Sequence, residues 1–329
     1  MSIASASVTR PADAPGGVDP DRLVAQARAI VDNVEKVVLG HHGAVHVVTS
    51  ALLAGGHVLL EDVPGSGKTT LARALARTLG CSFGRIQATA DLLPADITGS
   101  GVWDGRRSAF SFVPGPVFAQ VVLVDELNRT SPRTQSALLE AMEEAAVTVD
   151  GTRHPLPDPF FLIATQNPIE QFGTFPLPES QLDRFAVALP LGPLDPAAEL
   201  QVLRDQLRRA TVDDLPAVLT PERLVALRTA VRTVHVAEPV LQHASALVRA
   251  TRADPRVRVG ASPRAALSLV RCAQARALLL GRSFVTPDDT KALAVPALSH
   301  RLALDGGSRA DRDAVVTDLV QRVPVPVAT

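Results

Sequence analysis

Residues 58–70 read V-L-L-E-D-V-P-G-S-G-K-T-T, and this stretch constrains the fold more than any other part of the chain. A short apolar run enters a turn of proline and glycine, and a Gly-Lys-Thr triplet then opens a helix. Such a unit forms an anion site, because backbone N–H groups and the positive end of the helix dipole converge there. The stretch therefore predicts a loop that cradles the phosphates of a nucleoside triphosphate. Its predicted contacts are Pro64, Gly65, Ser66, Gly67, Lys68, Thr69 and Thr70.

Two residues of this loop bear on its charge. Lys68 is one of three lysines in a chain whose remaining basic side chains, histidine aside, are arginine. A compact ammonium fits between phosphate oxygens better than a planar guanidinium does. Asp62 stands where the general pattern has its first glycine, and a carboxylate repels phosphates unless its side chain points away. We expect the loop to bind phosphate despite this departure.

Length and composition limit the class of protein. The 329 residues suggest two domains, or one large domain with an accessory one, and a hydrophobic content of 46% is enough for buried cores. The net charge of -1 argues against a dedicated nucleic-acid binder. Cys81 and Cys272 lie far apart in sequence, so they predict small core residues in a reducing cytoplasm rather than a metal motif or a disulfide framework.

The beginning of the chain shows no secretory signal. Residues 1–20 are rich in small and polar residues and predict a disordered tail. The long apolar stretch at 44–60 is broken by Gly55 and Gly56, so it predicts a helix followed by a buried strand rather than a membrane span.

The order of patterns predicts an α/β nucleotide-binding domain over 21–192 and a helical domain over 193–329. Short apolar runs buried on both faces alternate with helices, which is typical of a parallel sheet between helices. Asp-Gly pairs predict two inserted β-hairpins. After about residue 193 the strand-like runs stop, and a hydroxyl residue before proline marks several helix starts. The expected helices are 21–39 and 44–54, with one after the phosphate loop bearing Leu71, Leu75 and Leu79; the strands are 84–87, 121–124 and 160–164; the hairpins are 102–112 and 147–156; the later helix starts are Pro221, Pro263 and Pro287.

Two acids follow a buried strand at residues 121–124. In phosphate-loop enzymes such a strand tip points at the nucleotide. Asp125 is expected to hold Mg²⁺ with help from Thr69, and Glu126 to orient and polarise a water for attack on the γ-phosphate. The predicted metal ligands are therefore Thr69 and Asp125.

Three further residues are candidates for the same chemistry. Asn167 ends another buried strand, where its amide can bind the γ-phosphate or the attacking water; the alternative is that it only begins a turn. Arg264 lies in the first turn of a predicted helix, where a cation is disfavoured and a phosphate partner would suit it. Arg184 follows a loop rich in proline and glycine and is either a finger for another subunit's nucleotide or one half of an ion pair within the chain.

A histidine pair precedes the phosphate loop. His42 and His46 are four residues apart on a predicted helix, and His41 adjoins them. A metal site needs more ligands, and the sequence offers no evident third one, so we expect a solvated or half-buried helix face.

The order of these motifs resembles that of an AAA+ ATPase, and the connecting text is similar to the MoxR family. The resemblance covers roughly residues 21–304. The phrases that carry it are L-A-G-G-H-V-L-L-E at 53–61, R-I-Q at 85–87, D-L-L-P-A-D-I-T-G at 91–99, P-G-P at 114–116, D-E-L-N-R at 125–129, S-A-L-L-E-A-M-E-E at 136–144, A-T-Q-N-P at 164–168 and G-A-S-P-R-A at 260–265.

The resemblance implies an AAA+ core with five parallel strands and a C-terminal all-helical lid. The hairpin at 102–112 is implied to be an insert within the second helix, and the one at 147–156 to precede the first sensor strand. It also implies roles for single residues: Lys68 in the phosphate loop, Asp125 and Glu126 as the Walker B pair, Asn167 as sensor 1, Arg264 as sensor 2, Arg184 as the finger acting in trans, and Val38, Leu39 and Gly40 near the adenine. His41 stands where family members often carry glutamine.

By this resemblance the expected cofactors are ATP and Mg²⁺, and the expected assembly is a homo-oligomeric ring, usually a hexamer. The expected activity is ATP-driven, chaperone-like remodelling of a protein client that carries a von Willebrand factor A domain. The hairpins would engage the client, and the lid would sense the γ-phosphate through Arg264.

Three other functions remain open at this point. The ATPase subunit of a magnesium or cobalt chelatase shares the same inserted hairpins. A nucleotide-gated scaffold with little turnover is disfavoured by the intact Asp125, Glu126, Asn167 and Arg184. A DNA translocase needs basic hairpins, and here only Arg106, Arg107 and Arg153 lie on them.

Overall fold

The computed structural model describes residues 20–63, 65–106, 108–167, 173–207 and 212–326. A five-stranded sheet has the order β2-β5-β8-β1-β9, and every pairing in it is parallel. This confirms the predicted five-stranded parallel sheet. Its strands are β1 (Val58–Glu61), β2 (Phe83–Gln87), β5 (Val121–Asp125), β8 (Phe161–Gln166) and β9 (Val187–Leu189).

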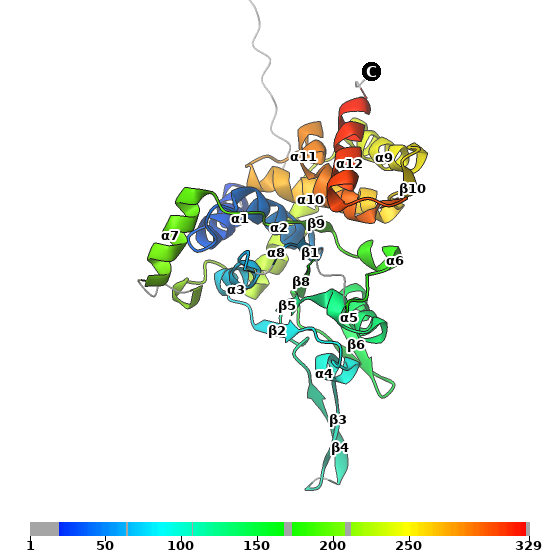
Figure 1. Ribbon diagram of the computed structural model, residues 1–329. Helices are drawn as coiled ribbons and strands as arrows, with labels where there is room; N and C mark the ends of the chain where they lie inside the picture. Colours follow the sequence, from blue (N-terminus) through cyan, green and yellow to red (C-terminus); the bar gives the residue numbers. More distant parts are fainter. Residues whose placement is uncertain (1–19, 64, 107, 168–172, 208–211, 327–329) are drawn as a thin grey trace, which may run out of the picture.

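The central strands are apolar throughout because helices cover both faces of the sheet. Alternate residues of a strand point to opposite faces. Val121 and Leu123 pack into one core with the helices α1, α2 and α3, whereas Val122 and Val124 pack into a second core with α5. Figure 1 shows α3 and α5 on opposite sides of the strands. These helices are α1 (Pro20–Val34), α2 (His42–Ala54), α3 (Lys68–Thr78) and α5 (Pro132–Glu144).

Both predicted hairpins form. The first joins β3 (Gly99–Asp104) to β4 (Ala109–Pro114) and projects from the body of the molecule (Figure 1). The resemblance implied that this hairpin interrupts a helix. A short helix, α4 (Pro94–Thr98), does precede the hairpin, but residues 115–120 after it form turns rather than a helix. The second joins β6 (Ala146–Val149) to β7 (Thr152–Pro155) directly before β8.

The first helix ends earlier than the predicted residue 39. After Val34 the chain tightens into turns, in which the N–H groups of Glu35 and Val38 donate to the carbonyls of Val31 and Val34. Gly40 then takes a left-handed conformation, with φ of 74°, before α2 begins. Residues 35–41 are therefore a connector between two helices.

The C-terminal part is mainly helical, and α8, α10 and α11 begin at the three predicted prolines. The prediction that this region is all-helical is wrong at one place. A small antiparallel ribbon forms between β10 (Val257–Val259) and β11 (Ala303–Leu304). Strands this short leave no periodic pattern in the sequence. The helices of this part are α7 (Pro196–Leu207), α8 (Pro221–Val231), α9 (Glu238–Ala253), α10 (Pro263–Leu279), α11 (Pro287–Leu298) and α12 (Arg309–Arg322), with 3-10 turns at Val212–Asp214 and Ser299–Arg301. The short helix α6 (Glu179–Leu182) and a 3-10 turn at Leu127–Arg129 lie earlier in the chain.

The C-terminal helices share one apolar core with the N-terminal helices. Helix α10 packs on α2, and buried side chains of α8 to α11 belong to the same apolar cluster as those of α1 and α3. Cys272 is buried in this cluster and Cys81 packs against it, and both are free thiols. No helix in the described ranges is long and apolar enough to cross a bilayer. The predicted tail lies almost wholly outside the described residues, which begin at Pro20.

Candidate nucleotide-binding site

A cavity of about 370 Å³ opens where β1, β5 and β8 end. It brings together most of the residues that the sequence singled out: the loop, both acids and Asn167. Pro64 lies outside the described residues. The lining residues are Asp62, Gly65, Ser66, Gly67, Lys68, Thr69, Thr70, Arg85, Asp125, Glu126, Thr165, Gln166 and Asn167.

The loop has the backbone shape that a phosphate cradle needs. Gly65 and Gly67 have φ of 85° and 89°, a left-handed conformation in which a side chain is strained. Gly67 directly precedes α3, so the N–H groups of the first helical turn face the cavity. The ammonium of Lys68 lies within this loop, 3.0 Å from the carbonyl oxygen of Asp62 and 2.7 Å from that of Val63. Burial lowers the pKa of Lys68, and the neighbouring carboxylates oppose that shift.

Asp62 uses its carboxylate away from the loop glycines. One oxygen accepts hydrogen bonds from the backbone N–H groups of Leu191 and Gly192, each at 3.0 Å, and the other accepts from the N–H of Val63. These bonds fix the loop to the chain that follows β9. The aspartate at the first loop position therefore has a structural role, and three N–H donors partly offset the negative charge of its carboxylate near the phosphate loop.

Thr165 holds the two acids in place from the neighbouring strand. Its hydroxyl donates to Asp125 Oδ1 at 2.8 Å and accepts from the backbone N–H of Glu126 at 2.8 Å. Glu126 has φ of 58°, a left-handed conformation that is uncommon for a residue other than glycine. Such strain persists where surrounding contacts fix it and is frequent at active sites.

Three more side chains surround the acids. Arg85 donates to Asp125 Oδ2 at 2.9 Å. Arg129 pairs with Glu126 Oε2 at 3.0 Å, and the amide of Gln87 donates to the same oxygen at 3.4 Å. None of these residues, nor Thr165, was predicted from the sequence to have a role in the site. The only available signal was their position at the ends of the strands that it had already marked.

The residues present fit Mg²⁺. Thr69 supplies a hydroxyl oxygen and Asp125 a carboxylate oxygen, and both line the same cavity as Lys68. Mg²⁺ prefers oxygen ligands and is usually held by one or two protein groups together with substrate phosphates.

A contact with the C-terminal helices lies behind the loop. Gln166 donates to Glu61 Oε1 at 2.5 Å, and Glu61 also forms an ion pair with Arg309 at the start of α12. Glu61 is 5% exposed, so this carboxylate needs its partners. The strand that leads into the phosphate loop is thus tied directly to the last helix.

Arg184 and Arg264 lie together, but not in the phosphate cavity. Arg184 Nη2 is 3.1 Å from Glu143 Oε2, and Arg264 pairs with the other oxygen of the same carboxylate. The hydrogen bond from Arg264, together with the charge of Arg184, lowers the pKa of Glu143. Neither arginine is among the described residues that line the phosphate cavity. Arg184 instead lines a second hollow, of about 340 Å³, between α5 and α6.

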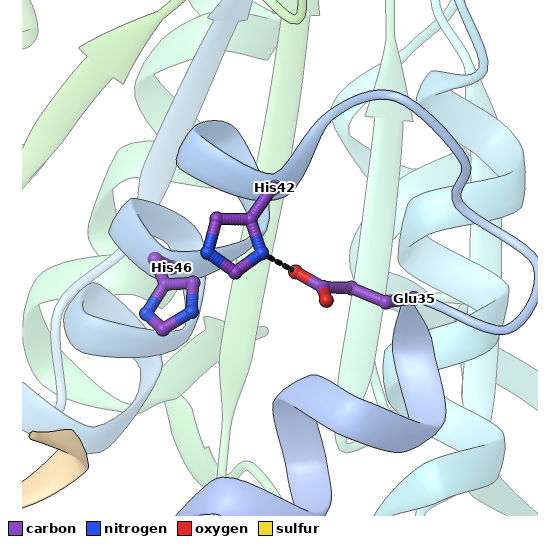
Figure 2. A group of neighbouring side chains, drawn as sticks. All are labelled: Glu35, His42 and His46. Carbon is purple, nitrogen blue, oxygen red and sulfur yellow. Dashed lines mark ion pairs between the residues drawn. The ribbon is translucent and has the colours of Figure 1, made fainter. Parts of the chain in front are cut away.

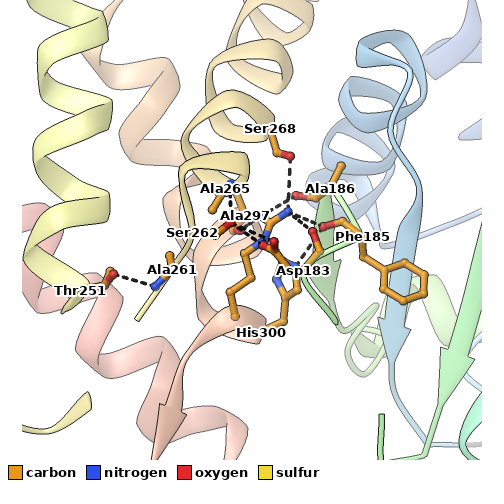
Figure 3. Close-up of polar contacts among 11 residues, drawn as sticks. Asp183, Phe185, Ala186, Thr251, Ala261, Ser262, Ala265, Ser268, Ala297 and His300 are labelled. Carbon is orange, nitrogen blue, oxygen red and sulfur yellow. Dashed lines mark hydrogen bonds and ion pairs between the residues drawn. The ribbon is translucent and has the colours of Figure 1, made fainter. Parts of the chain in front are cut away.

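A buried guanidinium fixes the backbone around both arginines. Arg301 is only 2% exposed at its side chain, and it donates to the carboxylate of Asp183 at 2.8 Å. It also donates to the carbonyls of Asp183 and Phe185, at 3.1 and 2.7 Å, which bracket Arg184. Figure 3 shows Ser262, whose hydroxyl donates to Asp183 at 2.9 Å while capping α10 two residues before Arg264.

The residues expected near the adenine are outside the cavity lining. Val38 is buried in the main apolar cluster, and Leu39 and Gly40 are partly or fully accessible. A Cβ on Gly40 would meet Leu194 and Ala198 at 2.9 Å, so this connector touches the chain around the start of α7.

Comparisons with known proteins bear on the family. The model of the ATPase family associated with various cellular activities (AAA) matches residues 57–187, and that of the AAA lid domain matches 249–323. The protein named Chaperone MoxR1 of Mycobacterium tuberculosis is 35% identical, over 95% of this chain and 86% of its own length. A protein named MoxR of Methylorubrum extorquens is 33% identical, over 88% of this chain and 91% of its own length.

The chain belongs to the MoxR family of AAA+ ATPases. An uncharacterized Bacillus subtilis protein, YeaC, is 45% identical over 90% of this chain and 94% of its own length. The crystal structure of a putative ATPase from Cytophaga hutchinsonii superposes with a TM-score of 0.86 at 35% identity, covering 94% of this chain and 97% of that one. The family confirms the resemblance inferred from the sequence and implies that this chain binds a nucleotide.

Proposed function

We propose that this protein hydrolyses ATP with Mg²⁺ and uses the cycle to remodel a protein client. Lys68 and the N–H groups of the loop would hold the β- and γ-phosphates. Thr69 and Asp125 would hold Mg²⁺, which neutralises the charge that develops on the phosphate oxygens. Glu126 would orient and polarise the attacking water, and Asn167, at the end of the neighbouring strand, would bind that water or the γ-phosphate.

The observation that carries the proposal is the separation of the arginines from the acids. Phosphoryl transfer needs positive charge at the γ-phosphate beyond the lysine and the metal ion. Arg184 and Arg264 supply two such charges on one edge of the chain, yet both pair with Glu143 rather than lining the phosphate cavity. We propose that both act on the nucleotide of a neighbouring copy, so that each site is completed by two subunits in a ring, expected to be a hexamer.

A head-to-tail arrangement follows from this geometry. The phosphate cavity of one copy would face the arginine edge of the next, which is a heterologous contact, and such contacts close into rings when the rotation permits. The Asp183–Arg301 contact would hold the arginine edge ready for docking. Asp183 also accepts a hydrogen bond from Ser262, which caps α10. Movement of the lid helices would therefore move both arginines together.

The projecting β3–β4 hairpin suits client contact. Trp103 and Phe110 face each other across it with ring centroids 5.3 Å apart, and the two residues are 56% and 74% exposed. Exposed aromatic pairs of this kind are costly in water and are typical of interaction sites. We propose that this pair contacts the client, and that the client carries a von Willebrand factor A domain, as the family resemblance suggests.

We further propose that residues 21–192 act as the nucleotide-binding core and 193–329 as the lid, in a cytoplasmic protein. The contacts of α2 with α10 and of Glu61 with Arg309 would carry nucleotide-dependent movement between the two. Cys81 and Cys272 are free thiols, which agrees with a reducing compartment.

The proposal is tested by steady-state ATP hydrolysis against protein concentration, with mass read by light scattering. Specific activity is expected to rise as the ring assembles and to fall by about 1,000-fold in Arg184→Ala, the lower end for loss of an arginine finger. Arg223→Ala, which removes an exposed arginine on α8, is the matched control and should behave as wild type. Activity that is independent of concentration and unaffected by Arg184→Ala would contradict the shared site.

A further inference from the structure

Three side chains of types that bind metal ions lie together where the connector between α1 and α2 meets α2. The sequence predicted no third ligand for His42 and His46, and the structure corrects this, because Glu35 lies against them (Figure 2). Glu35 Oε1 is 2.6 Å from His42 Nδ1, and the two imidazole rings have centroids 4.4 Å apart. One ligand atom from each residue lies within 4.8 Å of the other two.

The early end of α1 produces this arrangement. Because α1 stops at Val34, the chain turns back through residues 35–41 and places Glu35 beside the first turn of α2. His42 and His46 are one helical turn apart, so they share a face of α2. A helix that continued to residue 39, as the sequence predicted, would have carried Glu35 on a straight segment instead.

We propose that Glu35, His42 and His46 form a zinc-binding site. Two imidazole nitrogens and one carboxylate oxygen are a ligand set that Zn²⁺ accepts in four-coordinate sites, with solvent in the fourth position. Zinc bonds of about 2.0–2.1 Å separate tetrahedral ligand atoms by about 3.4 Å. That value lies between the 2.6 Å from Glu35 Oε1 to His42 Nδ1 and the 4.8 Å within which all three ligand atoms lie, so rotation of the side chains would admit the ion.

The surroundings favour a divalent cation over a simple ion pair. His42 is 73% exposed at its side chain, so it is free to turn, whereas Glu35 is 28% exposed and partly shielded from water. His46 is partly buried and lies beside His42 on the same face of α2. Asp32 adds a second negative charge near His46, and Arg276 on α10 opposes it.

Zinc at this position would link the end of α1 to the start of α2. The connector between them carries Gly40 and touches residues 194–198, so the ion would stiffen a segment that otherwise depends on a few turns. Because the three ligands come together only in the folded chain, binding stabilises the fold by mass action.

The test is calorimetric titration of the full chain, without a histidine tag, with ZnCl₂ at neutral pH. Wild type is expected to bind one Zn²⁺ per chain, and His42→Ala and His46→Ala each to weaken binding by about 100-fold or more, because loss of a ligand's hydrogen-bond partner alone costs up to about 100-fold. His235→Ala, an exposed histidine elsewhere, is the matched control and should bind as wild type. Absence of saturable binding, or unchanged affinity in His42→Ala, would overturn the proposal.

A second measurement separates coordination from folding. Co²⁺ in the same site should give the strong visible absorption of a tetrahedral ion in wild type and in His235→Ala, and lose it in His42→Ala. The exposed position of His42 makes its substitution harmless to the fold, which thermal unfolding without metal checks. Zn²⁺ should then raise the melting temperature of wild type but not of Glu35→Gln; an equal rise in both would also overturn the proposal.

Discussion

The guanidinium of Arg184 lies 3.1 Å from the carboxylate of Glu143, which it shares with Arg264. One carboxylate thus holds the two arginines from separate parts of the chain side by side. Two cations are kept this close only where a counter-ion or a phosphate neutralises them. In the proposed ring, the phosphate of a neighbouring copy would take over that role from Glu143.

The first prediction concerns mixtures of Arg184→Ala with Arg264→Ala. If both arginines serve the same neighbouring site, every interface in a mixed ring lacks one of them, so ATP hydrolysis stays as low as in either variant alone. If Arg264 acted on its own subunit's nucleotide, some interfaces would regain both arginines. A clear rise in phosphate release on mixing would therefore contradict the common role of the pair.

The second prediction concerns Glu126→Gln. The amide keeps the size of the side chain but cannot polarise water, so turnover is expected to fall by about 100-fold or more while ATP still binds. Nucleotide binding by fluorescence and phosphate release by a coupled assay measure the two effects separately. Glu199→Gln, at an exposed position on α7, is the control. Turnover near that of wild type would remove Glu126 from the catalytic role.

The third prediction concerns Asp183→Asn, which leaves the buried Arg301 without its counter-ion. We expect the free energy of unfolding to fall by about 2 kcal/mol, since Asp183 is partly exposed and Arg301 keeps its carbonyl partners. Urea denaturation measures the change. Asp305→Asn, with a side chain 89% exposed, should change stability by less than about 0.5 kcal/mol. Equal effects of the two substitutions would show that Asp183 is not a structural anchor.

The fourth prediction concerns pH. His57 is buried, accepts a hydrogen bond from the N–H of Leu162 and lies 3.1 Å from the carbonyl of Met142, and burial lowers its pKa to about 4. An unfolded histidine titrates near 6.5, so the unfolded chain binds more protons between these values. The stability contributed by neutral His57 is complete above about pH 6.5 and is lost as the pH falls towards 4.

Its measurement compares wild type with His57→Asn, whose amide oxygen can still accept from Leu162. Between about pH 7.5 and about pH 5, wild type should lose about 2 kcal/mol more stability than the variant. Taking the difference between the two proteins removes the contribution of other titrating groups. Parallel curves for wild type and variant would show that His57 does not carry this dependence.

The fifth prediction concerns the hairpin pair. Trp103→Ser combined with Phe110→Ser removes exposed aromatic surface far from the phosphate loop, so unstimulated ATP hydrolysis and the urea midpoint should stay as in wild type. Capture of a von Willebrand factor A domain protein, and any stimulation of turnover by it, should be lost. Capture at full strength by the double variant would place the client elsewhere.

Much of the nucleotide site could be predicted because its signals are local. The phosphate loop, Asp125 and Glu126 each lie at the end of a short buried strand, and a parallel sheet brings such ends to one edge. The contacts of Glu143 with Arg264 and of Arg301 with Asp183 could not be predicted. Each joins residues more than a hundred positions apart, and no short sequence pattern indicates such a pairing.

Other differences arise from competition between local preferences. The apolar spacing of residues 21–39 is helical, yet tertiary packing ends the helix at Val34 and so creates the contact of Glu35 with His42. The ribbon of β10 and β11 was missed because two or three residues carry no period. Thr165 was overlooked although it stands two positions before Asn167, since a threonine in a buried strand is ordinarily a packing residue.

The shared active site is the central claim, and mixing Lys68→Ala with Arg184→Ala tests it most directly. Each variant alone should hydrolyse little ATP, because Lys68→Ala lacks the lysine that binds phosphate and Arg184→Ala lacks the arginine finger. In mixed rings an intact cavity from an Arg184→Ala subunit can face an intact arginine edge from a Lys68→Ala subunit, so phosphate release should recover in part. If the mixture stays as inactive as its components while light scattering shows that mixed rings form, the two residues do not act across a subunit boundary.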